Sequence, residues 1–298
     1  MVSCYNYDYC EGVEIMKIKL ITDSTCDLSK TLIEEHDIDV IPLFVNFSET
    51  SYKDGVELTT EEMYEKVSEL GMVPKTAAAS PGMFEETFKK YIENDYEIIY
   101  LGIGAKFSAT YQNAMLAKKL LDDSDKIHIV DSRNLSSGSG LLLLKAAKYK
   151  AQGKSPLEIV ELLNKDRLNV KTAFVIDTLE YLHKGGRLKA ISAFVGTMLK
   201  LHPIIKVVDG EMTIGKKPRG KMSNAIKHML KDVLKDSKHI DPDFLMVTHS
   251  KADQYVDMIK EELEDIDIEN IYETEAGCVI SSHCGAGTIG VLYIKNND

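Results

Sequence analysis

The chain has 298 residues, of which 44% are hydrophobic and 28% are charged. These values are typical of a soluble globular protein with one large or two ordinary domains. The formal net charge of −11 argues against nucleic-acid binding, which needs an excess of Lys and Arg. No stretch approaches the ~20 apolar residues that span a bilayer, and residues 1–15 lack the pattern of a signal peptide. We therefore expect a cytoplasmic protein in which residues 1–15 form a disordered extension.

Strands and helices alternate in the first half of the chain. Apolar runs predict buried strands at residues 17–23, 38–47, 96–104 and 126–132. Helices are predicted at about residues 28–36, 59–70, 81–92, 109–121 and 140–149. A Thr59-x-x-Glu62 capping box opens one of these helices, and Ser80-Pro81 opens another. This alternation predicts a mainly parallel sheet with helices on both faces.

The second half of the chain has a different pattern. Asp209-Gly210 suits a tight turn and predicts a hairpin over residues 203–217. Further strands are predicted at residues 171–177, 243–250, 268–276 and 288–294, and helices at residues 178–188, 222–234 and 251–265. A hairpin among alternating elements indicates a mixed sheet. We therefore predict two α/β domains, an N-terminal one over residues 16–165 and a C-terminal one with a mixed sheet over residues 166–298.

The five cysteines do not form a metal-binding or disulfide pattern. They are odd in number and contain no C-x-x-C pair, and the set is Cys4, Cys10, Cys26, Cys278 and Cys284. A disulfide framework or a structural zinc site is therefore not expected.

Ligands of open α/β sheets usually bind beyond the carboxyl ends of the strands, and three segments there carry polar side chains. Asp23, Ser24, Thr25 and Asp27 follow the first strand, either as helix-capping residues or as the polar floor of a site. The loop with Thr76 and Ser80 is rich in alanine, which either suits a helix entry or lets a ligand approach closely. Ser108, after Gly102 and Gly104, either caps a helix or lies beside backbone N–H groups that bind an anion. This segment matches neither nucleotide-binding glycine pattern.

Two segments of the second half have both a structural and a functional interpretation. After Gly185-Gly186-Arg187, apolar residues either belong to the core or line an elongated pocket: Leu188, Ile191, Phe194, Val195, Met198 and Leu199. Residues 216–221 include four basic side chains, which form either a solvated loop or a surface for a partner or a phosphate.

His283 lies in the small-residue stretch SSHCGAGTIG. It has no second histidine at metal-ligand spacing, and His249 follows a different strand, so a metal site is not expected. The sequence contains no G-x-S-x-G nucleophile elbow, although a Ser-His-Asp triad remains open. An imidazole that donates a hydrogen bond to a carboxylate is the simplest interpretation.

Six stretches taken in chain order, from about Met16 onward, resemble the DegV family, the fatty-acid-binding proteins that serve bacterial fatty acid kinases. They are ITDSTCDLS, PKTAAASP, FSATYQNA, EYLHKGGRL, HPIIKVVDGEM and SSHCGAGTIG. The resemblance implies two α/β domains with an acyl chain held between or beneath them. It also implies that Thr76 and Ser108 bind the carboxylate of the fatty acid, and that His283 lies near the same head group.

The resemblance assigns two arginines and leaves four departures. Arg187, in the K-G-G-R motif, is implied to lie near the ligand. Arg219 matches a basic residue after the family's hairpin, where it would face the kinase or the phosphate. Alanine replaces the family's polar or turn residues at Ala77, Ala78, Ala109 and Ala286, which puts the geometry around the head group in doubt.

The function implied is that of a non-catalytic carrier. It would bind a long-chain fatty acid in an apolar tunnel and present the carboxylate to a separate fatty acid kinase. No cofactor is expected, and transient contact with a membrane is compatible with this role. Burial of the chain contributes ~0.8 kcal/mol per methylene, whereas the carboxylate needs several donors. One alternative is an acyl-transfer or hydrolytic enzyme with Ser108 as nucleophile and His283 as base. Another is a subunit related to dihydroxyacetone kinases, with His283 bonded to a small ketone.

Overall fold

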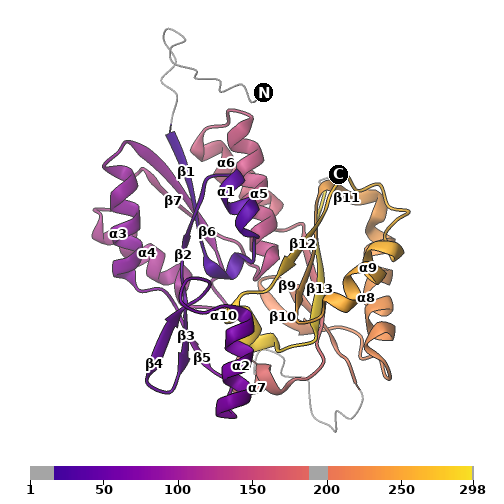
Figure 1. Cartoon of the computed structure of the whole chain (residues 1–298). Helices are drawn as coiled ribbons and strands as arrows, with labels where there is room; N and C mark the ends of the chain where they lie inside the picture. The colour runs from indigo at the N-terminus through magenta and orange to yellow at the C-terminus, as the bar shows by residue number, and fades with distance from the viewer. Residues whose placement is uncertain (1–16, 188–200, 297–298) are drawn as a thin grey trace, which may run out of the picture.

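The computed structural model describes residues 17–187 and 201–296, which form two lobes that lie side by side (Figure 1). The predicted extension over residues 1–15 and the apolar positions from Leu188 to Leu199 lie outside the described residues. Within these two ranges, no helix is long and apolar enough to cross a membrane.

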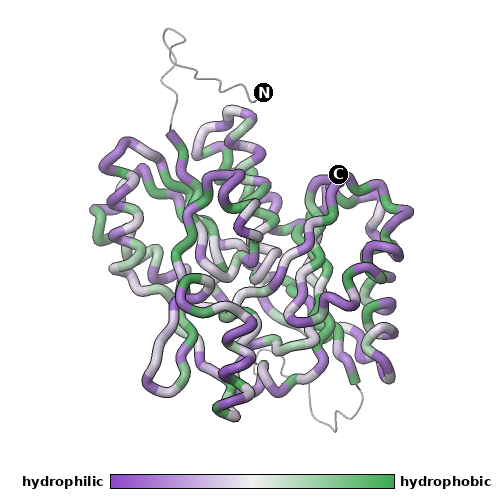
Figure 2. The backbone as a smooth tube through the Cα atoms, in the orientation of Figure 1, coloured by the Kyte–Doolittle hydropathy of each residue, from purple (hydrophilic) through white to green (hydrophobic). Residues whose placement is uncertain are grey.

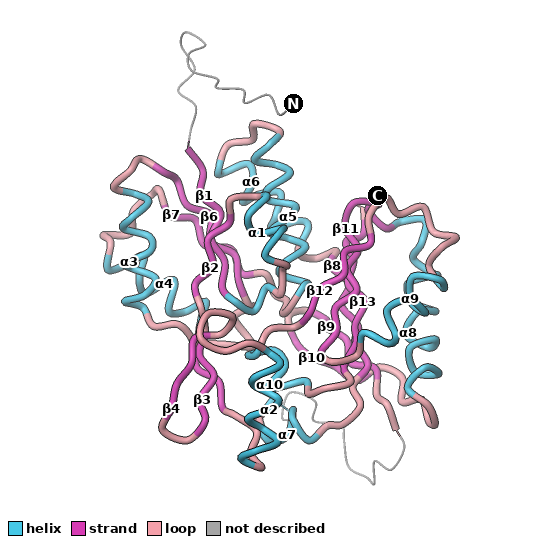
Figure 3. Tube along the Cα trace, viewed as in Figure 1, coloured by secondary structure: helices cyan, strands magenta, loops and turns pink. Residues whose placement is uncertain are grey.

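The first lobe alternates strands and helices, as the sequence predicts. Its elements in chain order are β1 (Lys17–Asp23), η1 (Ser24–Cys26), α1 (Lys30–Glu35), β2 (Ile38–Ile41), β3 (Phe44–Phe47), β4 (Thr50–Lys53), α2 (Thr60–Leu70), β5 (Lys75–Ala77), α3 (Pro81–Ile92), β6 (Tyr96–Gly102), α4 (Thr110–Leu120), β7 (Ile127–Asp131), α5 (Ser137–Ala151) and α6 (Pro156–Asp166). The main sheet is parallel, in the order β2-β1-β6-β7. Helices α3 and α4 cover one face and α5 and α6 cover the other (Figure 3), which confirms the predicted architecture.

The prediction of one strand over residues 38–47 is wrong. The chain leaves the main sheet after β2, and β3 joins a separate sheet of order β4-β3-β5. Pro42 lies between the two strands, and proline has no N–H for a sheet ladder. The small sheet also includes Thr76, in a segment that the sequence analysis treats as a loop.

The second lobe is built on a mixed sheet, which confirms the prediction for this half. Its elements are β8 (Val170–Val175), α7 (Glu180–Lys184), β9 (Ile204–Val208), β10 (Glu211–Ile214), α8 (Met222–Asp236), η3 (Ser237–His239), β11 (Ile240–Ser250), η4 (Asp253–Tyr255), α9 (Val256–Glu262), β12 (Ile271–Glu275), α10 (Cys278–Cys284) and β13 (Thr288–Lys295). The strand order is β10-β9-β8-β13-β11-β12, and only the β11–β12 pair is parallel among these strands. Helices α8 and α9, which alternate hydrophilic and hydrophobic residues, pack against this sheet (Figure 2).

Three local predictions for the second lobe have clear outcomes. The hairpin forms with Asp209 and Gly210 at its turn, both at positive φ, as a tight turn between twisted strands requires. The helix predicted over residues 251–265 is shorter, because α9 covers only Val256–Glu262. Helix α10, which carries His283, is absent from the predicted elements because seven residues are too few for a clear helical period.

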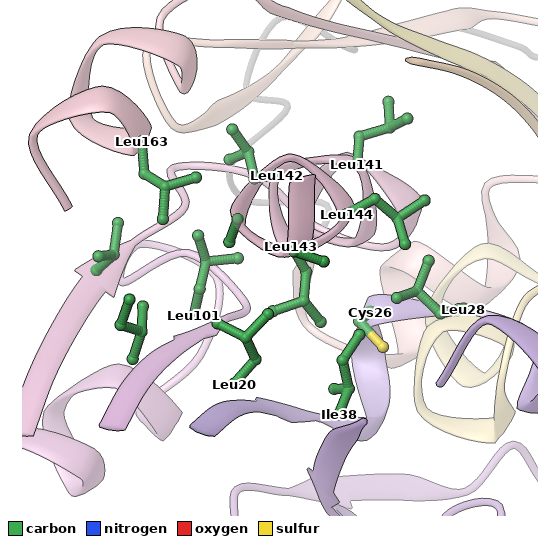
Figure 4. Packing of buried hydrophobic residues seen from close by; sticks show 14 of the residues in the cluster. Leu20, Cys26, Leu28, Ile38, Leu101, Leu141, Leu142, Leu143, Leu144 and Leu163 are labelled. Atoms are coloured by element: carbon green, nitrogen blue, oxygen red, sulfur yellow. The ribbon is translucent and has the colours of Figure 1, made fainter. Parts of the chain in front are cut away.

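Helix α5 lies between the two main sheets. Its residues from Ser137 to Ala147 are all buried, and its leucines contact Leu20 and Leu101 of the first sheet (Figure 4). The same core cluster includes Met246 and Leu292 of the second sheet. Each buried leucine contributes about 1.5–3 kcal/mol, and this shared core holds the lobes together. The domain boundary at residues 165/166 stays a prediction.

Candidate functional site

A cavity of about 280 Å³ lies between the two lobes. It is bounded by β5, the loop before α4, α7 with the residues after it, strands β8 and β10, and helix α10. Its described lining is mainly apolar, with a few polar side chains: Leu43, Thr76, Ala77, Ala78, Ile103, Phe107, Ser108, Ala109, Leu135, Phe174, Leu182, Arg187, Met212, Val279, Ile280, His283 and Cys284. The structure thus brings together four residues that the sequence analysis assigns to a ligand.

Thr76 and His283 form a hydrogen-bonded pair on the cavity wall. Thr76 lies on β5, opposite Val45 of β3, and its Oγ1 is 2.8 Å from Nε2 of His283. The two residues are 207 positions apart in the chain, so the pair exists only because α10 packs against the small sheet.

His283 is a neutral imidazole at physiological pH. Burial, with a smaller contribution from the positive charge of Arg187, lowers its pKa from 6.5 to about 4. Its Nδ1 is buried and makes no hydrogen bond within the described part of the chain. A Cβ at residue 185 would lie only 2.3 Å from that Nδ1. Gly185 therefore leaves the space that the imidazole ring occupies.

Ser108 presents a hydroxyl group to the cavity from the loop before α4. Its Oγ accepts a hydrogen bond from the backbone N–H of Thr110, at 3.2 Å, and lies 2.7 Å from the Thr110 hydroxyl. The N-cap position of α4 is Ala109, which has no capping side chain. Ser108 is thus one residue before the expected cap position.

Arg187 supplies the positive charge of the site. It lines the cavity, and its Nη1 donates a hydrogen bond to the carbonyl of Gly185 at 2.9 Å. No aspartate or glutamate occurs among the described lining residues. A cation without a nearby carboxylate favours an anionic ligand group, because the attraction is strong where water is partly excluded.

An apolar extension of the cavity leads into the second lobe. A smaller cavity of about 50 Å³ shares Leu135, Phe174, Ile280 and Cys284 with the first one. It reaches Gly290 and Leu292 on the central strand β13. The two cavities thus share an apolar wall, and Thr76, Ser108, Arg187 and His283 line only the larger one.

Other residues singled out from the sequence lie elsewhere. Arg219 is exposed and is not part of the cavity lining. Ser80 caps α3, as its structural interpretation expects. The Asp23 carboxylate accepts hydrogen bonds from Tyr100 Oη at 2.8 Å and from the backbone N–H groups of Thr25 and Ile103 at 3.0 and 2.9 Å. It thus holds the loops after β1 and β6 rather than a ligand.

The apolar wall of the cavity was not predicted from the sequence. Phe107, Leu135, Phe174, Met212 and Ile280 line it, but their apolar side chains are indistinguishable in sequence from ordinary core residues. A possible signal for α10 was present in Gly277 and Gly285, which bracket seven residues. Among the described residues, no group of three His, Cys, Asp or Glu side chains could hold a metal ion.

Comparison with known proteins assigns the chain to a family. The sequence model of the DegV family matches residues 17–296. A DegV domain-containing protein of Clostridium acetobutylicum is 35% identical over 280 residues, 94% of this chain and 99% of that protein. A structure described as showing fatty acid binding of a DegV family protein from Thermus thermophilus has a TM-score of 0.87 at 30% identity, over 94% of this chain and 100% of that one. A structure described as a stearic acid-binding protein from Eubacterium ventriosum has a TM-score of 0.81 at 27% identity, over 93% and 98%. The chain belongs to the DegV family.

Proposed function

We propose that this protein binds a long-chain fatty acid in the cavity between its lobes and presents the carboxylate to a separate fatty acid kinase. The observation that carries the proposal is that the Thr76–His283 pair, Ser108 and Arg187 line a mainly apolar cavity whose described lining has no acidic side chain. Such an arrangement suits a molecule with one anionic end and a long apolar tail.

The carboxylate would bind through two hydroxyl groups, those of Thr76 and Ser108, and His283 would orient the Thr76 hydroxyl. With its proton on Nε2, a neutral His283 donates to Thr76 Oγ1, and the Thr76 hydroxyl proton is then free to donate to a carboxylate. Ser108 Oγ accepts from the Thr110 N–H, and in this proposal the Thr110 hydroxyl, 2.7 Å away, also donates to it, which leaves the Ser108 proton for the carboxylate. In this proposal His283 orients Thr76, and the direct donation from His283 expected from the sequence is not required.

The tail would lie along the apolar lining toward β13. Each buried methylene contributes ~0.8 kcal/mol, so a long chain offsets the cost of removing the carboxylate from water. The relatives described as fatty-acid-binding and stearic acid-binding have the same fold, which supports this class of ligand.

The opening of the cavity supports transfer to a partner. Ala77 is exposed and also lines the cavity, so the cavity reaches the surface beside a small side chain. A carboxylate there would be accessible to the active site of a kinase, which needs an unblocked attacking oxygen. In this proposal exposed Arg219 belongs to the surface that meets the kinase.

The geometry does not favour the alternative of an acyl-transfer or hydrolytic enzyme. That mechanism needs Ser108 within hydrogen-bond reach of His283 and a third group that orients the imidazole. Instead, His283 Nε2 contacts Thr76, Ser108 contacts Thr110, and His283 Nδ1 has no partner in the described structure.

Native mass spectrometry of protein purified from cells tests the binding proposal. We expect a copurified fatty acid, and we expect Ser108→Ala to weaken palmitate binding about 10- to 100-fold, because one hydrogen bond to the charged carboxylate is lost. Protein that copurifies without lipid and does not bind palmitate after lipid removal would refute the proposal. Purified kinase with ATP and the loaded protein should give acyl phosphate, and its absence would refute the carrier role alone.

A further inference from the structure

Helix α10 is capped at its N-terminus by side chains from distant parts of the chain. Its N-cap residue, Gly277, has no side chain with which to accept a hydrogen bond. The Asp54 carboxylate accepts from the N–H of Cys278, at 2.8 Å, and from that of Val279, at 3.4 Å. Asp27 Oδ1 accepts from the N–H of Gly277 at 2.9 Å. Two aspartate side chains thus satisfy N–H groups that have no partner inside the helix.

Both aspartate side chains are buried. Asp54 is 3% exposed and Asp27 is 4% exposed. Burial raises the pKa of both carboxyl groups, that of Asp27 to about 8, so Asp27 is mainly protonated at neutral pH and accepts through a neutral carboxyl oxygen. A Cβ at residue 277 would lie 3.3 Å from both oxygens of Asp54, so glycine there lets the aspartate side chains approach the backbone. The cost of burying these groups is offset only by well-formed hydrogen bonds.

The small sheet holds α10 at both ends. Asp54 follows β4 and its N–H donates to the carbonyl of Leu43, beside β3. Thr76 lies on β5, on the other side of β3. The helix extends from the Asp54 contact at Cys278 to His283, five residues or ~7.5 Å along its axis. The small sheet therefore positions both the N-terminus of α10, through Asp54, and the Thr76 hydroxyl that contacts the last turn of α10, through β5.

We propose that Asp54 and Asp27 are positioning residues of the head-group site, which fix α10 so that His283 meets Thr76. The inference rests on the proposed function, because it concerns how that site recognises a carboxylate. Further contacts support the same anchor: Thr60 Oγ1 donates to the carbonyl of Ala276, at 2.9 Å, just before the helix. Neither aspartate belongs to the cavity lining, so the anchor would act on the ligand only through other residues.

Asp54→Asn is the direct test. It is close in shape, but it replaces one acceptor oxygen with an amide group that cannot accept from a helix N–H. The readout is displacement of a fluorescent fatty acid analogue from delipidated protein, by palmitate and by hexadecanol in parallel. We expect palmitate affinity to fall about five- to twentyfold, because a displaced Thr76–His283 pair weakens a hydrogen bond to a charged group. Hexadecanol, which makes only neutral hydrogen bonds, should change less than about threefold.

Asp166→Asn is the matched control. Asp166 is also 4% exposed and accepts a hydrogen bond from Tyr149 Oη at 2.7 Å. It lies on α6 and takes part in none of the contacts with α10 described above. This variant should lose stability without changing the ratio of the two affinities. Equal losses for palmitate and hexadecanol in Asp54→Asn, or the same ratio change in Asp166→Asn, would overturn the inference.

Thr60→Val keeps the inference testable if Asp54→Asn does not fold. It removes one neutral hydrogen bond to the segment before α10 and should lower palmitate affinity about two- to threefold while leaving hexadecanol affinity unchanged. An unchanged palmitate affinity would count against the anchor. If the wild-type protein binds neither compound, the proposed function fails, whereas normal wild-type binding with an unchanged ratio in all variants refutes only the positioning role.

Discussion

Replacing Thr76 with valine removes the central hydroxyl of the proposed site and keeps the shape of the side chain. The Thr76 hydroxyl is 2.8 Å from His283 Nε2 and is the group proposed to donate to the carboxylate. A hydrogen bond to a charged group contributes about 1.5–3 kcal/mol, and about 1.4 kcal/mol corresponds to a tenfold change in affinity. We therefore expect palmitate to bind about 10- to 100-fold more weakly.

The assay is displacement of a fluorescent fatty acid analogue from delipidated protein, with chemical denaturation of the same samples. Thr76→Ser is the matched control, because it keeps the hydroxyl and should stay within about fivefold of the wild type. Thr76→Val should also lower the free energy of unfolding by about 1 kcal/mol, since His283 loses its hydrogen-bond partner. Palmitate affinity within about twofold of the wild type would refute the reasoning, as would an equal loss for hexadecanol.

Two further predictions concern His283. The unfolded chain binds a proton at this residue below pH 6.5, whereas the folded protein does so only below about 4. Stability from this group is therefore present above pH 6.5 and is lost as pH falls toward 4, by at most ~1.4 kcal/mol per pH unit. Denaturation curves of ligand-free protein at several pH values should show this slope, and His283→Gln should flatten it; an unchanged slope would mean that His283 is not held neutral. Gly185→Ala places a Cβ against the imidazole of His283. This variant should lower the free energy of unfolding by about 1–3 kcal/mol and should also weaken palmitate binding. Gly82→Ala, whose new Cβ would meet only Ser80 Oγ at 3.9 Å, should do neither, and equal behaviour of the two variants would contradict the packing argument.

Much of the first lobe was predictable because its signals are local. The Thr59 capping box and the Ser80-Pro81 start both occur where the sequence predicts them, since a helix cap depends on residues within one turn. The strand error at residues 38–47 has the opposite origin. The apolar run is continuous, but Pro42 interrupts the ladder and β3 pairs with strands of a different sheet.

The apolar helix α5 was predicted, but its environment was not. Four consecutive leucines among small residues indicate a helix without a polar face, which is typical of a helix buried on all sides. The sequence alone does not reveal which sheets it contacts. The partner of Lys145 is Asp241, 2.5 Å away and 96 residues later, and such a pairing depends on the arrangement of the two lobes.

The sequence by itself determined the fold class, the hairpin at Asp209-Gly210 and the residue types able to bind a carboxylate. These depend on periodicity, turn conformation and side-chain chemistry, which are properties of short segments. Only the tertiary structure decided that Thr76 and His283 form a pair, that Gly185 makes room for the imidazole, and that Asp54 caps α10. Each of these contacts joins residues about a hundred or more positions apart, and their distances follow from packing between elements, which no local pattern encodes.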